Sequence, residues 1–503
     1  MESREVVVVG AGIAGLTAAA LLARAGLPVL LLEAHQQSGG CAGTFRRGPY
    51  TFDVGATQVA GLEPGGIHAR LFAHLGVAPP AATALDPGCV VHLDDGTPPI
   101  RIWRHPGRWQ AERRRQFPGS ERFWALCTLL HRANWDFAAR DPVLPPRSLW
   151  DLHQLLAALG PANLAAGLLT ASSVADLLPL CGCAGDRRLR RFLDLQLRLY
   201  SQEPAERTAA LYGATVLAMA QEPLGLWHLH GSMQQLAARL ELALARWGGR
   251  LLCRTRVEEL RPDGRGGWRI GWRSAAGQAG ELEAGDVVCT LPPQLLPQLL
   301  GPALPERYGR RIAGFGEPSG ALVLYGAVPR RRLPEGVPGH LQFDWPDPGS
   351  LFVSVSQEGD GRAPAGQATV IASVFTPARP WFELASDAYG AAKASALAGI
   401  RRGLEALLGL APADWLHAEL ATPRGFARWT GRPNGYVGGL GQRPGRFGPF
   451  GLASRTPLPG LWLCGDSIHP GEGTAGVSLS ALTACRQLLH RRGLDLEISR
   501  AGH

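Results

Sequence analysis

The chain has 503 residues, of which 46% are apolar and 18% charged, and its formal net charge is +9. This length exceeds what one core supports, so we expect two or three domains, and the apolar fraction excludes a disordered protein. Lys393 is the only lysine, so the high arginine content reflects base bias and is no signal for nucleic acid. The positive charge still favours contact with an anionic surface or with phosphate groups.

The cysteines and the start of the chain further restrict the class of protein. Nine cysteines are scattered, and the one close pair, Cys181 and Cys183, lacks a nearby histidine. No metal-ligand spacing occurs, so we expect reduced thiols and no metal. The chain enters an apolar run at Val6 without a signal-peptide pattern. The most apolar segment, 161–183, contains Asp176 and Pro179, which predicts an apolar or interfacial helix rather than a membrane span.

Residues 4–34 predict a strand, a glycine-rich turn, a helix and a second strand. Within the turn, Gly10 makes the bend, Gly12 lets the backbone approach a pyrophosphate, and Gly15 lets the helix pack closely on the strand. Glu33 ends the second strand, where a carboxylate accepts hydrogen bonds from ribose hydroxyls and disfavours the 2′-phosphate of NADP. The pattern predicts a dinucleotide site without choosing between NAD and FAD.

A second glycine-rich junction lies near the end of the chain, at 461–484. An apolar run ends at Gly465-Asp466, and an alanine-rich helical pattern follows three closely spaced glycines, Gly471, Gly473 and Gly476. Unpaired backbone N–H groups at such a junction can approach a phosphate or a cofactor ring. We therefore expect both chain ends to contribute to one cofactor site.

The doublet Gly39-Gly40, the segment "YTFDVGATQ" at 50–58 and the late Gly465-Asp466 resemble the flavin amine-oxidase and carotenoid-desaturase superfamily. The resemblance implies FAD, with the doublet along its pyrophosphate and ribityl chain and the late glycines near the isoalloxazine. Basic residues that many relatives carry after the acid or the doublet are replaced here by Ala34 and Cys41. Further FAD contacts implied by the resemblance are Ile13, Ala14, Thr44, Gly55, Ala56, Thr57, Val257, Gly473, Gly476 and Val477.

The stretches 50–76, 114–124, 192–202 and 470–484 look like the cyanobacterial-type carotenoid C-3′,4′-desaturases of myxol-type carotenoid synthesis. This resemblance implies transfer of a hydride from a carotenoid to flavin, loss of a proton to a base or solvent, and reoxidation by quinone or oxygen. Glu472 and His469 are the titratable groups of the flavin-proximal segment and the candidate catalytic residues. Three alternatives stay open: a carotene cis–trans isomerase, a non-catalytic polyene or prenyl carrier, and an amine oxidase with an aromatic cage of Trp429 and Tyr436.

We expect an α/β protein with three parts: a Rossmann-like FAD-binding domain of the glutathione-reductase or amine-oxidase type, a mixed β-sheet substrate domain and a helical, membrane-facing insertion. The family pattern implies that the FAD-binding domain consists of 1–76, 225–300 and 455–490. The substrate sheet would take a hairpin from 77–103 and the segment 301–454, the helical substrate and membrane region would be 104–224, and 491–503 would form a tail.

Local patterns support this division. Residues 232–247 predict a helix, and 251–257 and 285–293 predict strands of the FAD-binding domain. Residues 90–103 predict a β-hairpin with its turn near Asp95-Gly96, which would join strands at 321–328, 351–356 and 368–375.

Residues 101–124 interleave seven arginines with five aromatic residues, Trp103, Trp109, Phe117, Phe123 and Trp124. Such a mixture suits an anionic membrane interface, and it equally suits a solvated arginine face over a packed aromatic core. We expect peripheral attachment on the cytoplasmic side of a membrane, with 101–124 supplying electrostatic attraction and a helix such as 161–183 embedded. No motif supports nucleic-acid binding.

Overall fold

The structure is a computed structural model that describes residues 5–346 and 349–498. A five-stranded parallel sheet has the strand order β10-β2-β1-β14-β20. Its strands come from the beginning, the middle and the end of the chain, so distant segments share one sheet. Their bounds are Arg250–Leu252 (β10), Val29–Leu32 (β2), Val6–Val9 (β1), Asp286–Cys289 (β14) and Leu461–Leu463 (β20).

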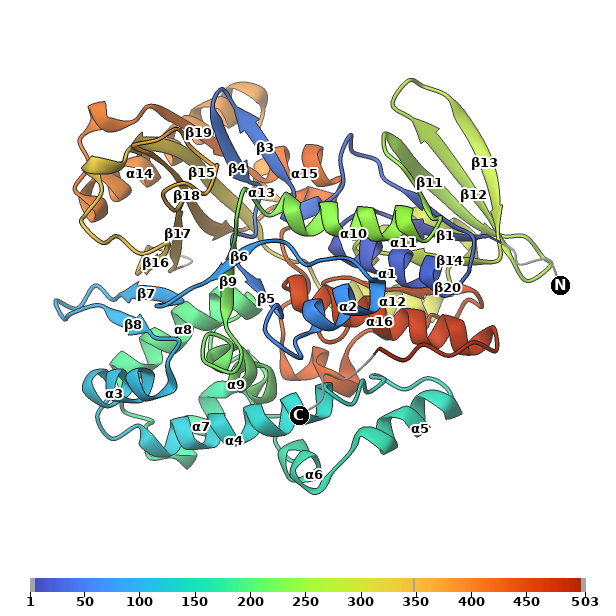
Figure 1. Ribbon diagram of the computed structural model, residues 1–503, viewed down its shortest axis with the longest axis horizontal. Helices are drawn as coiled ribbons and strands as arrows, with labels where there is room; N and C mark the ends of the chain where they lie inside the picture. Colours follow the sequence, from blue (N-terminus) through green and yellow to red (C-terminus); the bar gives the residue numbers. More distant parts are fainter. Residues whose placement is uncertain (1–4, 347–348, 499–503) are drawn as a thin grey trace.

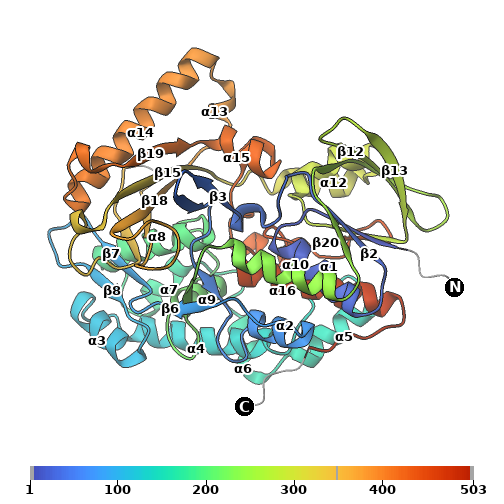
Figure 2. The same cartoon turned by 45° about the horizontal axis from the view of Figure 1, so that its top comes forward.

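Alternate residues of these strands enter two separate cores. Val6 and Val8 face a helical layer, whereas Val7 and Val9 face the opposite layer. The helical layer, in which α10, α1 and α16 run beside one another in Figures 1 and 2, contains α1 (Ile13–Arg24), α2 (Ile67–Leu75), α10 (Gln234–Arg246) and α16 (Thr474–Arg491). Because α1 is covered by the sheet and by two helices, it is apolar on every side.

The predicted strand 251–257 is divided in two. After β10 the chain turns at Arg254, which has a φ of 57°, and Thr255 N donates to Glu33 O at 2.8 Å. The chain then enters a three-stranded antiparallel sheet on the second face, made of β11 (Thr255–Pro262), β12 (Trp268–Ser274) and β13 (Ala279–Ala284). Only the first part of the predicted strand therefore belongs to the parallel sheet.

A seven-stranded mixed sheet has the order β19-β15-β18-β17-β16-β7-β8. The hairpin predicted at 90–103 is present, because β7 pairs antiparallel with β8 and joins the later strands through β16. The bounds are Cys89–His92 (β7), Ile100–Ile102 (β8), Gly320–Pro329 (β15), His340–Phe343 (β16), Leu351–Val355 (β17), Gln367–Thr376 (β18) and His417–Ala421 (β19).

Seven helices occupy most of 104–224: α3 (Pro106–Gln116), α4 (Glu121–Ala138), α5 (Leu149–Ala158), α6 (Pro161–Gly167), α7 (Val174–Leu180), α8 (Arg187–Ser201) and α9 (Ala210–Ala218). The single helix predicted at 161–183 is wrong, because the segment forms α6 and α7. A capping box starts the second helix, in which Asp176 N donates to Ser173 Oγ and Ser173 N donates to Asp176.

Four of the five aromatic residues of 101–124 form part of a core rather than a surface. Trp109, Phe117, Phe123 and Trp124 are at most 5% exposed; Phe123 packs on Trp124, and the other three rings pack on Phe192. Of the two interpretations of this segment, the packed aromatic core is correct, and the presentation of these four rings to a membrane is wrong. The pattern could not distinguish the two, because arginine stems can cover apolar surface in both.

The FAD-binding layers and the mixed sheet are joined by a buried ionic cluster. Arg362 donates to Asp53 at 3.0 Å and to Asp360 at 3.1 Å, and His228 lies 2.9 Å from Asp360. All four side chains are almost fully buried. The cluster connects β4 (Tyr50–Asp53), β9 (Leu226–Leu229) and the loop before β18, three segments that are far apart in sequence.

The remaining helices and strands complete the layers and the connections between them: β3 (Thr44–Arg47), β4 (Tyr50–Asp53), β5 (Val59–Ala60), β6 (Ala82–Ala84), β9 (Leu226–Leu229), α11 (Leu296–Leu300), α12 (Glu306–Gly314), α13 (Pro380–Glu383), α14 (Ser386–Leu408) and α15 (Pro423–Thr430). The predicted tail 491–503 begins at the last residue of α16, and 499–503 lie outside the described residues. Among the described residues, no helix combines the length and apolar content needed to cross a bilayer. Within 5–346 and 349–498, no group of metal-ligating side chains is placed to hold a metal ion.

Candidate functional site

One elongated cavity of about 780 Å³ begins at the carboxyl ends of the parallel strands. Gly10 after β1, Glu33 after β2 and Gly465 after β20 line this end. The other walls come from the helical region and the mixed sheet, including Tyr200 on α8 and Val216 on α9. Ligands of open α/β sheets bind at this edge, so the cavity lies where a cofactor and a substrate can meet.

Two helix N-termini border the cavity. Helix α1 begins after Gly12 and α16 begins after Gly473, and neither N-terminus has a side-chain cap. The two helices pack against each other, and Thr17 Oγ1 lies 3.3 Å from Ser478 Oγ in the second turn of each helix, so their N-terminal ends lie in the same region. Unsatisfied N–H groups and the helix dipoles favour a negatively charged group there, such as a diphosphate.

The glycines of the first turn fit a bound dinucleotide. A Cβ at Gly12 would meet no atom within 4 Å, and its φ of −68° suits any residue, so a side chain there would stand in the cavity. A Cβ at Gly15 would lie 1.8 Å from Gly10 O, so Gly15 is required for packing. Gly39 and Gly40, both with positive φ, bring a second backbone turn against Gly12. The cradle is therefore open where a pyrophosphate needs space and tight where the helix meets the strand.

Glu33 is held at the end of β2 by backbone donors. Ala11 N and His35 N each donate to its carboxylate at 2.7 Å. The carboxylate also lines the cavity beside the first glycine turn. This position suits contact with a ribose, because the acid lies at the carboxyl end of the second strand.

The late Gly465-Asp466 pair is fixed by an arginine that sequence reasoning missed. Arg432 forms a 2.5 Å ion pair with Asp466 and donates to Gly438 O at 2.8 Å. Burial alone would lower the pKa of Arg432, but the Asp466 carboxylate raises it, so the guanidinium stays charged. The pair positions a carboxylate on the cavity wall at the end of β20.

Glu472 lies just before α16 and is buried on the cavity wall. One carboxylate oxygen accepts a 2.6 Å hydrogen bond from Gln202 Nε2 and a 3.1 Å hydrogen bond from Gly439 N. Burial raises the pKa of Glu472 to about 8, and the charge of Asp466 adds to the shift. The group can therefore both hold and release a proton near neutral pH.

His469 lies on the same loop and lines the same cavity. Burial lowers its pKa to about 4, so the ring is neutral at ordinary pH. Its Nδ1 has no hydrogen-bond partner, and the ring centroid lies 5.5 Å from that of Phe447. A neutral imidazole beside an aromatic ring is compatible with an apolar substrate.

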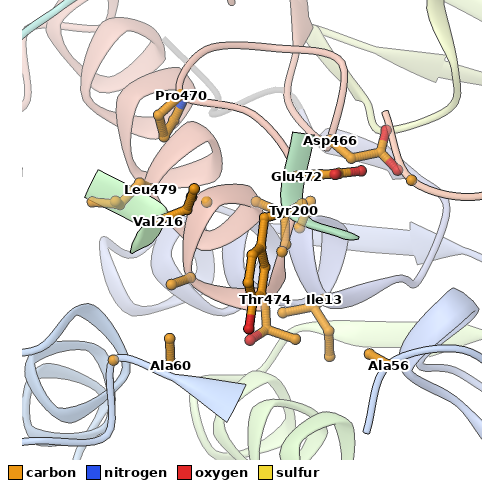
Figure 3. A pocket seen from close by; sticks show the side chains of 18 of the residues that line it. Ile13, Ala56, Ala60, Tyr200, Val216, Asp466, Pro470, Glu472, Thr474 and Leu479 are labelled. Atoms are coloured by element: carbon orange, nitrogen blue, oxygen red, sulfur yellow. The ribbon is translucent and has the colours of Figure 1, made fainter. Parts of the chain in front are cut away.

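The part of the cavity beyond Glu472 is mainly apolar. Tyr200, Tyr212 and Phe447 line it together with leucine and valine side chains, and Tyr212 Oη donates to Tyr200 O at 2.6 Å. Figure 3 shows Glu472 and Asp466 toward one end of the view and Val216 and Leu479 toward the other. We call this apolar part of the cavity the apolar arm. It adjoins the polar end at the glycine turns, an arrangement that suits a long apolar molecule that must reach a cofactor.

The structure brings most of the predicted site residues to this one cavity. Its lining includes both candidate catalytic residues, Glu472 and His469, and fifteen predicted cofactor contacts: Gly10, Gly12, Ile13, Ala14, Glu33, Gly39, Gly40, Gly55, Ala56, Thr57, Gly465, Asp466, Gly473, Gly476 and Val477. Their contacts to the cofactor itself remain predictions.

Three predicted cofactor residues do not line the cavity. Gly15 packs under Gly10, and Thr44 is engaged by Asp53 at 3.0 Å and by Gln234 N at 3.2 Å. Val257 is buried among the side chains of the second core. Each packs against its neighbours in this structure, and its contact with the cofactor stays a prediction.

The structure does not bring Trp429 and Tyr436 together as an aromatic cage. Trp429 lines the cavity near Gly40 and packs on His35 with centroids 4.3 Å apart. Tyr436 is buried and hydrogen-bonded to Asn434. The aromatic residues around the apolar arm come from other segments, whose role no local motif indicates.

Comparison with known proteins agrees with this geometry. The model of the flavin-containing amine oxidoreductase family matches residues 13–489, so the chain belongs to that family. The fold is similar to that of putrescine oxidase (TM-score 0.63, 20% identity) and of cyclohexylamine oxidase from Brevibacterium oxydans (TM-score 0.61, 19% identity). Each alignment covers 97% of this chain and 99% of the other.

Two relatives are named prolycopene isomerase and all-trans-retinol 13,14-reductase. The chain is 26% identical to the chloroplastic prolycopene isomerase of Arabidopsis thaliana, over 98% of this chain and 83% of that one. It is 24% identical to the all-trans-retinol 13,14-reductase of Danio rerio, over 52% of this chain and 42% of that one. The protein is an FAD-dependent oxidoreductase of the amine oxidase family, with an amine-oxidase-type FAD-binding α/β fold.

Proposed function

We propose that this protein desaturates a carotenoid at a carbon–carbon single bond next to the polyene. The observation that carries the proposal is the single cavity in which an apolar arm, lined by Tyr200 and Val216, continues from the dinucleotide cradle past Glu472. A substrate in this arm would have a long apolar body and would present one bond to the cofactor. The similarity to prolycopene isomerases, which extends over 98% of this chain, supports a polyene of carotenoid size.

In this reaction one carbon loses its hydrogen as hydride and the neighbouring carbon loses a proton. A C=C bond then joins the two carbons. Bound FAD supplies the two-electron hydride acceptor. The residues of the chain provide the rest. The N-termini of α1 and α16 and the open space at Gly12 would hold the cofactor, and the apolar walls would orient the polyene and exclude water.

Glu472 would accept the proton. Its carboxylate oxygen is fixed by Gln202 and Gly439, so the group is held in one orientation on the cavity wall. Loss of hydride leaves positive charge on the polyene, which a nearby carboxylate stabilises. Because its pKa is raised to about 8, the carboxylate form becomes dominant only above that pH.

The finer assignment to the C-3′,4′ bond of a monocyclic or hydroxylated carotenoid rests on the resemblance of 50–76, 114–124, 192–202 and 470–484 to that branch. Quinone or oxygen would then reoxidise the flavin. The cavity lining does not select the bond.

A carotene cis–trans isomerase is the second candidate function. The full-length relatives named prolycopene isomerases favour it, and the same cavity would serve. In that case Glu472 in its protonated form would donate to the polyene and take the proton back, with no net oxidation. A non-catalytic carrier is disfavoured, because it would not need the open cradle at Gly12.

Anaerobic incubation of the FAD-loaded protein with candidate carotenes and a quinone tests the proposal. Desaturation gives a product lighter by two hydrogen atoms with absorption shifted to the red. A product of unchanged mass and altered double-bond geometry would assign the isomerase function instead. Binding without any chemical change, for all substrates and acceptors, would contradict both reactions.

A further inference from the structure

Helices α5 and α6 expose an apolar face to solvent. The side chains of Leu149, Leu152 and Leu156 on α5 follow helical spacing, and Leu149 is 86% exposed. Leu164 on α6 is 61% exposed, and Leu168 directly after it is 86% exposed. We call these five residues the leucine face. Exposed leucines grouped on adjacent helices indicate an interaction surface, whereas scattered ones do not.

The segment 149–171 carries almost no charge. Apart from His153, Asp151 is its only acidic or basic residue, and it is fully buried in an ion pair with Arg455. The outer side of these helices therefore presents leucine, alanine and proline, with His153 as the only titratable group. Arg147, just before α5, is exposed, and α4 carries both an exposed Arg132 and an exposed Asp136.

The same two helices form a wall of the cavity. Leu155 and Leu159 from the α5 side and Asn163, Ala166 and Gly167 from α6 line it. Figure 1 places α5 and α6 at an edge of the molecule, on the side away from the mixed sheet. Only the thickness of these short helices therefore separates the leucine face from the cavity.

We propose that the leucine face inserts into the interfacial region of a lipid bilayer and that the cavity receives its substrate from that side. The occupant is a bilayer rather than a second copy of the chain, because a polyene substrate resides in lipid and the face covers its cavity. This step rests on the proposed polyene substrate. The helices are too short to span a membrane, so they would lie in its surface plane.

This assignment moves the attachment away from residues 101–124 and keeps part of the expected embedded segment 161–183, because α6 and Leu168 lie within it. Four of the aromatic rings of 101–124 are in the core, and the apolar surface lies instead on α5 and α6. Apolar insertion should therefore dominate over electrostatic attraction. We expect binding to phosphatidylcholine vesicles that strengthens with phosphatidylglycerol and persists in high salt.

Vesicle flotation with the FAD-loaded protein tests the surface. The double variant Leu149→Ser/Leu168→Ser should lower the vesicle partition coefficient by ~10²-fold or more, since two exposed leucines lose their apolar contact. The control Leu242→Ser/Leu416→Ser changes two leucines on other elements that are 52% and 48% exposed, and it should partition like the wild type. Flavin content and thermal unfolding verify that both variants fold.

Delivery of the substrate provides a second readout. The Leu149→Ser/Leu168→Ser variant should lose turnover of carotene presented in vesicles and keep turnover of carotene presented in detergent micelles. Wild-type protein that fails to float with either vesicle type would overturn the proposal, as would equal loss in the control variant. A wild-type dimer that dissociates in the Leu149→Ser/Leu168→Ser variant would assign the face to a second copy. Because flotation involves no reaction, its result stands even if the proposed function is wrong.

Discussion

Gly12 precedes α1 and Gly15 lies in its first turn, yet the structure gives the two glycines different roles. A side chain at Gly12 would enter the cavity, whereas one at Gly15 would collide with Gly10 O. We expect Gly12→Val to lower FAD occupancy by tenfold or more while the protein still folds. Gly15→Ala should instead lower the free energy of unfolding by ~1–3 kcal/mol through overpacking.

Flavin absorbance and denaturant unfolding of the two variants measure these effects. Gly26→Ala is unsuitable as a control, because Gly26 has a φ of +84°, whereas Gly314→Ala changes a glycine with open space and ordinary φ. That variant should retain both flavin and stability. Full FAD occupancy in Gly12→Val would show that the cofactor does not pass this turn.

Glu472 allows a direct test of proton transfer. Glu472→Gln keeps the shape and removes the ionisable group, so we expect turnover to fall by ~10²-fold or more with FAD still bound. Gln202→Leu removes one of the two donors to the carboxylate and should shift the pH profile with a smaller loss of turnover. Near-normal turnover of Glu472→Gln at full flavin occupancy would leave the carboxylate a structural role only.

The pH profile separates the two candidate reactions. The pKa of Glu472 is raised to about 8, so the carboxylate fraction increases as the pH rises through that value. If Glu472 accepts a proton in desaturation, turnover should rise toward high pH and level off above about 8. If the protonated form donates in isomerisation, turnover should fall over the same range. The residual activity of Glu472→Gln should not follow either curve.

At the scale of elements, the ionic cluster around Arg362 holds β4, β9 and the loop before β18 together. Arg362→Met would leave the Asp53 and Asp360 carboxylates buried without their cation, and we expect a loss of ~3–5 kcal/mol in unfolding free energy. Arg261→Met removes an exposed ion pair and should change stability little. Equal stability of both variants in urea unfolding would mean that the cluster does not join the layers.

Elements defined by local chemistry were predictable from the sequence. The strand, glycine turn and helix at 6–24 follow from contiguous residues, and so does the hairpin of β7 and β8. The break at Arg254 was not predictable, because it depends on hydrogen bonds to Glu33 and His35 from a distant segment. Arg432 and Gln202 were missed for the same reason, since only the folded chain brings them to Asp466 and Glu472.

At the scale of the whole molecule, the cofactor cradle is assembled from segments at both chain ends and from the middle. The parallel sheet contains β1, β14 and β20, and α1 packs against α16 across almost the full length of the sequence. A site built in this way forms only when all of these segments are in place. FAD binding should therefore stabilise the whole FAD-binding unit rather than one segment of it.

Thermal unfolding with added FAD tests this coupling. A ligand that binds only the native state at a free concentration of about 100 times its Kd adds about 2.7 kcal/mol to the free energy of unfolding. We expect a single transition that moves to higher temperature as FAD increases, whether it is followed by circular dichroism or by intrinsic tryptophan fluorescence. Gly12→Val should show no shift, because its added side chain occupies the cofactor space. Two transitions, of which FAD moves only one, would mean that the cradle folds separately from the rest of the chain.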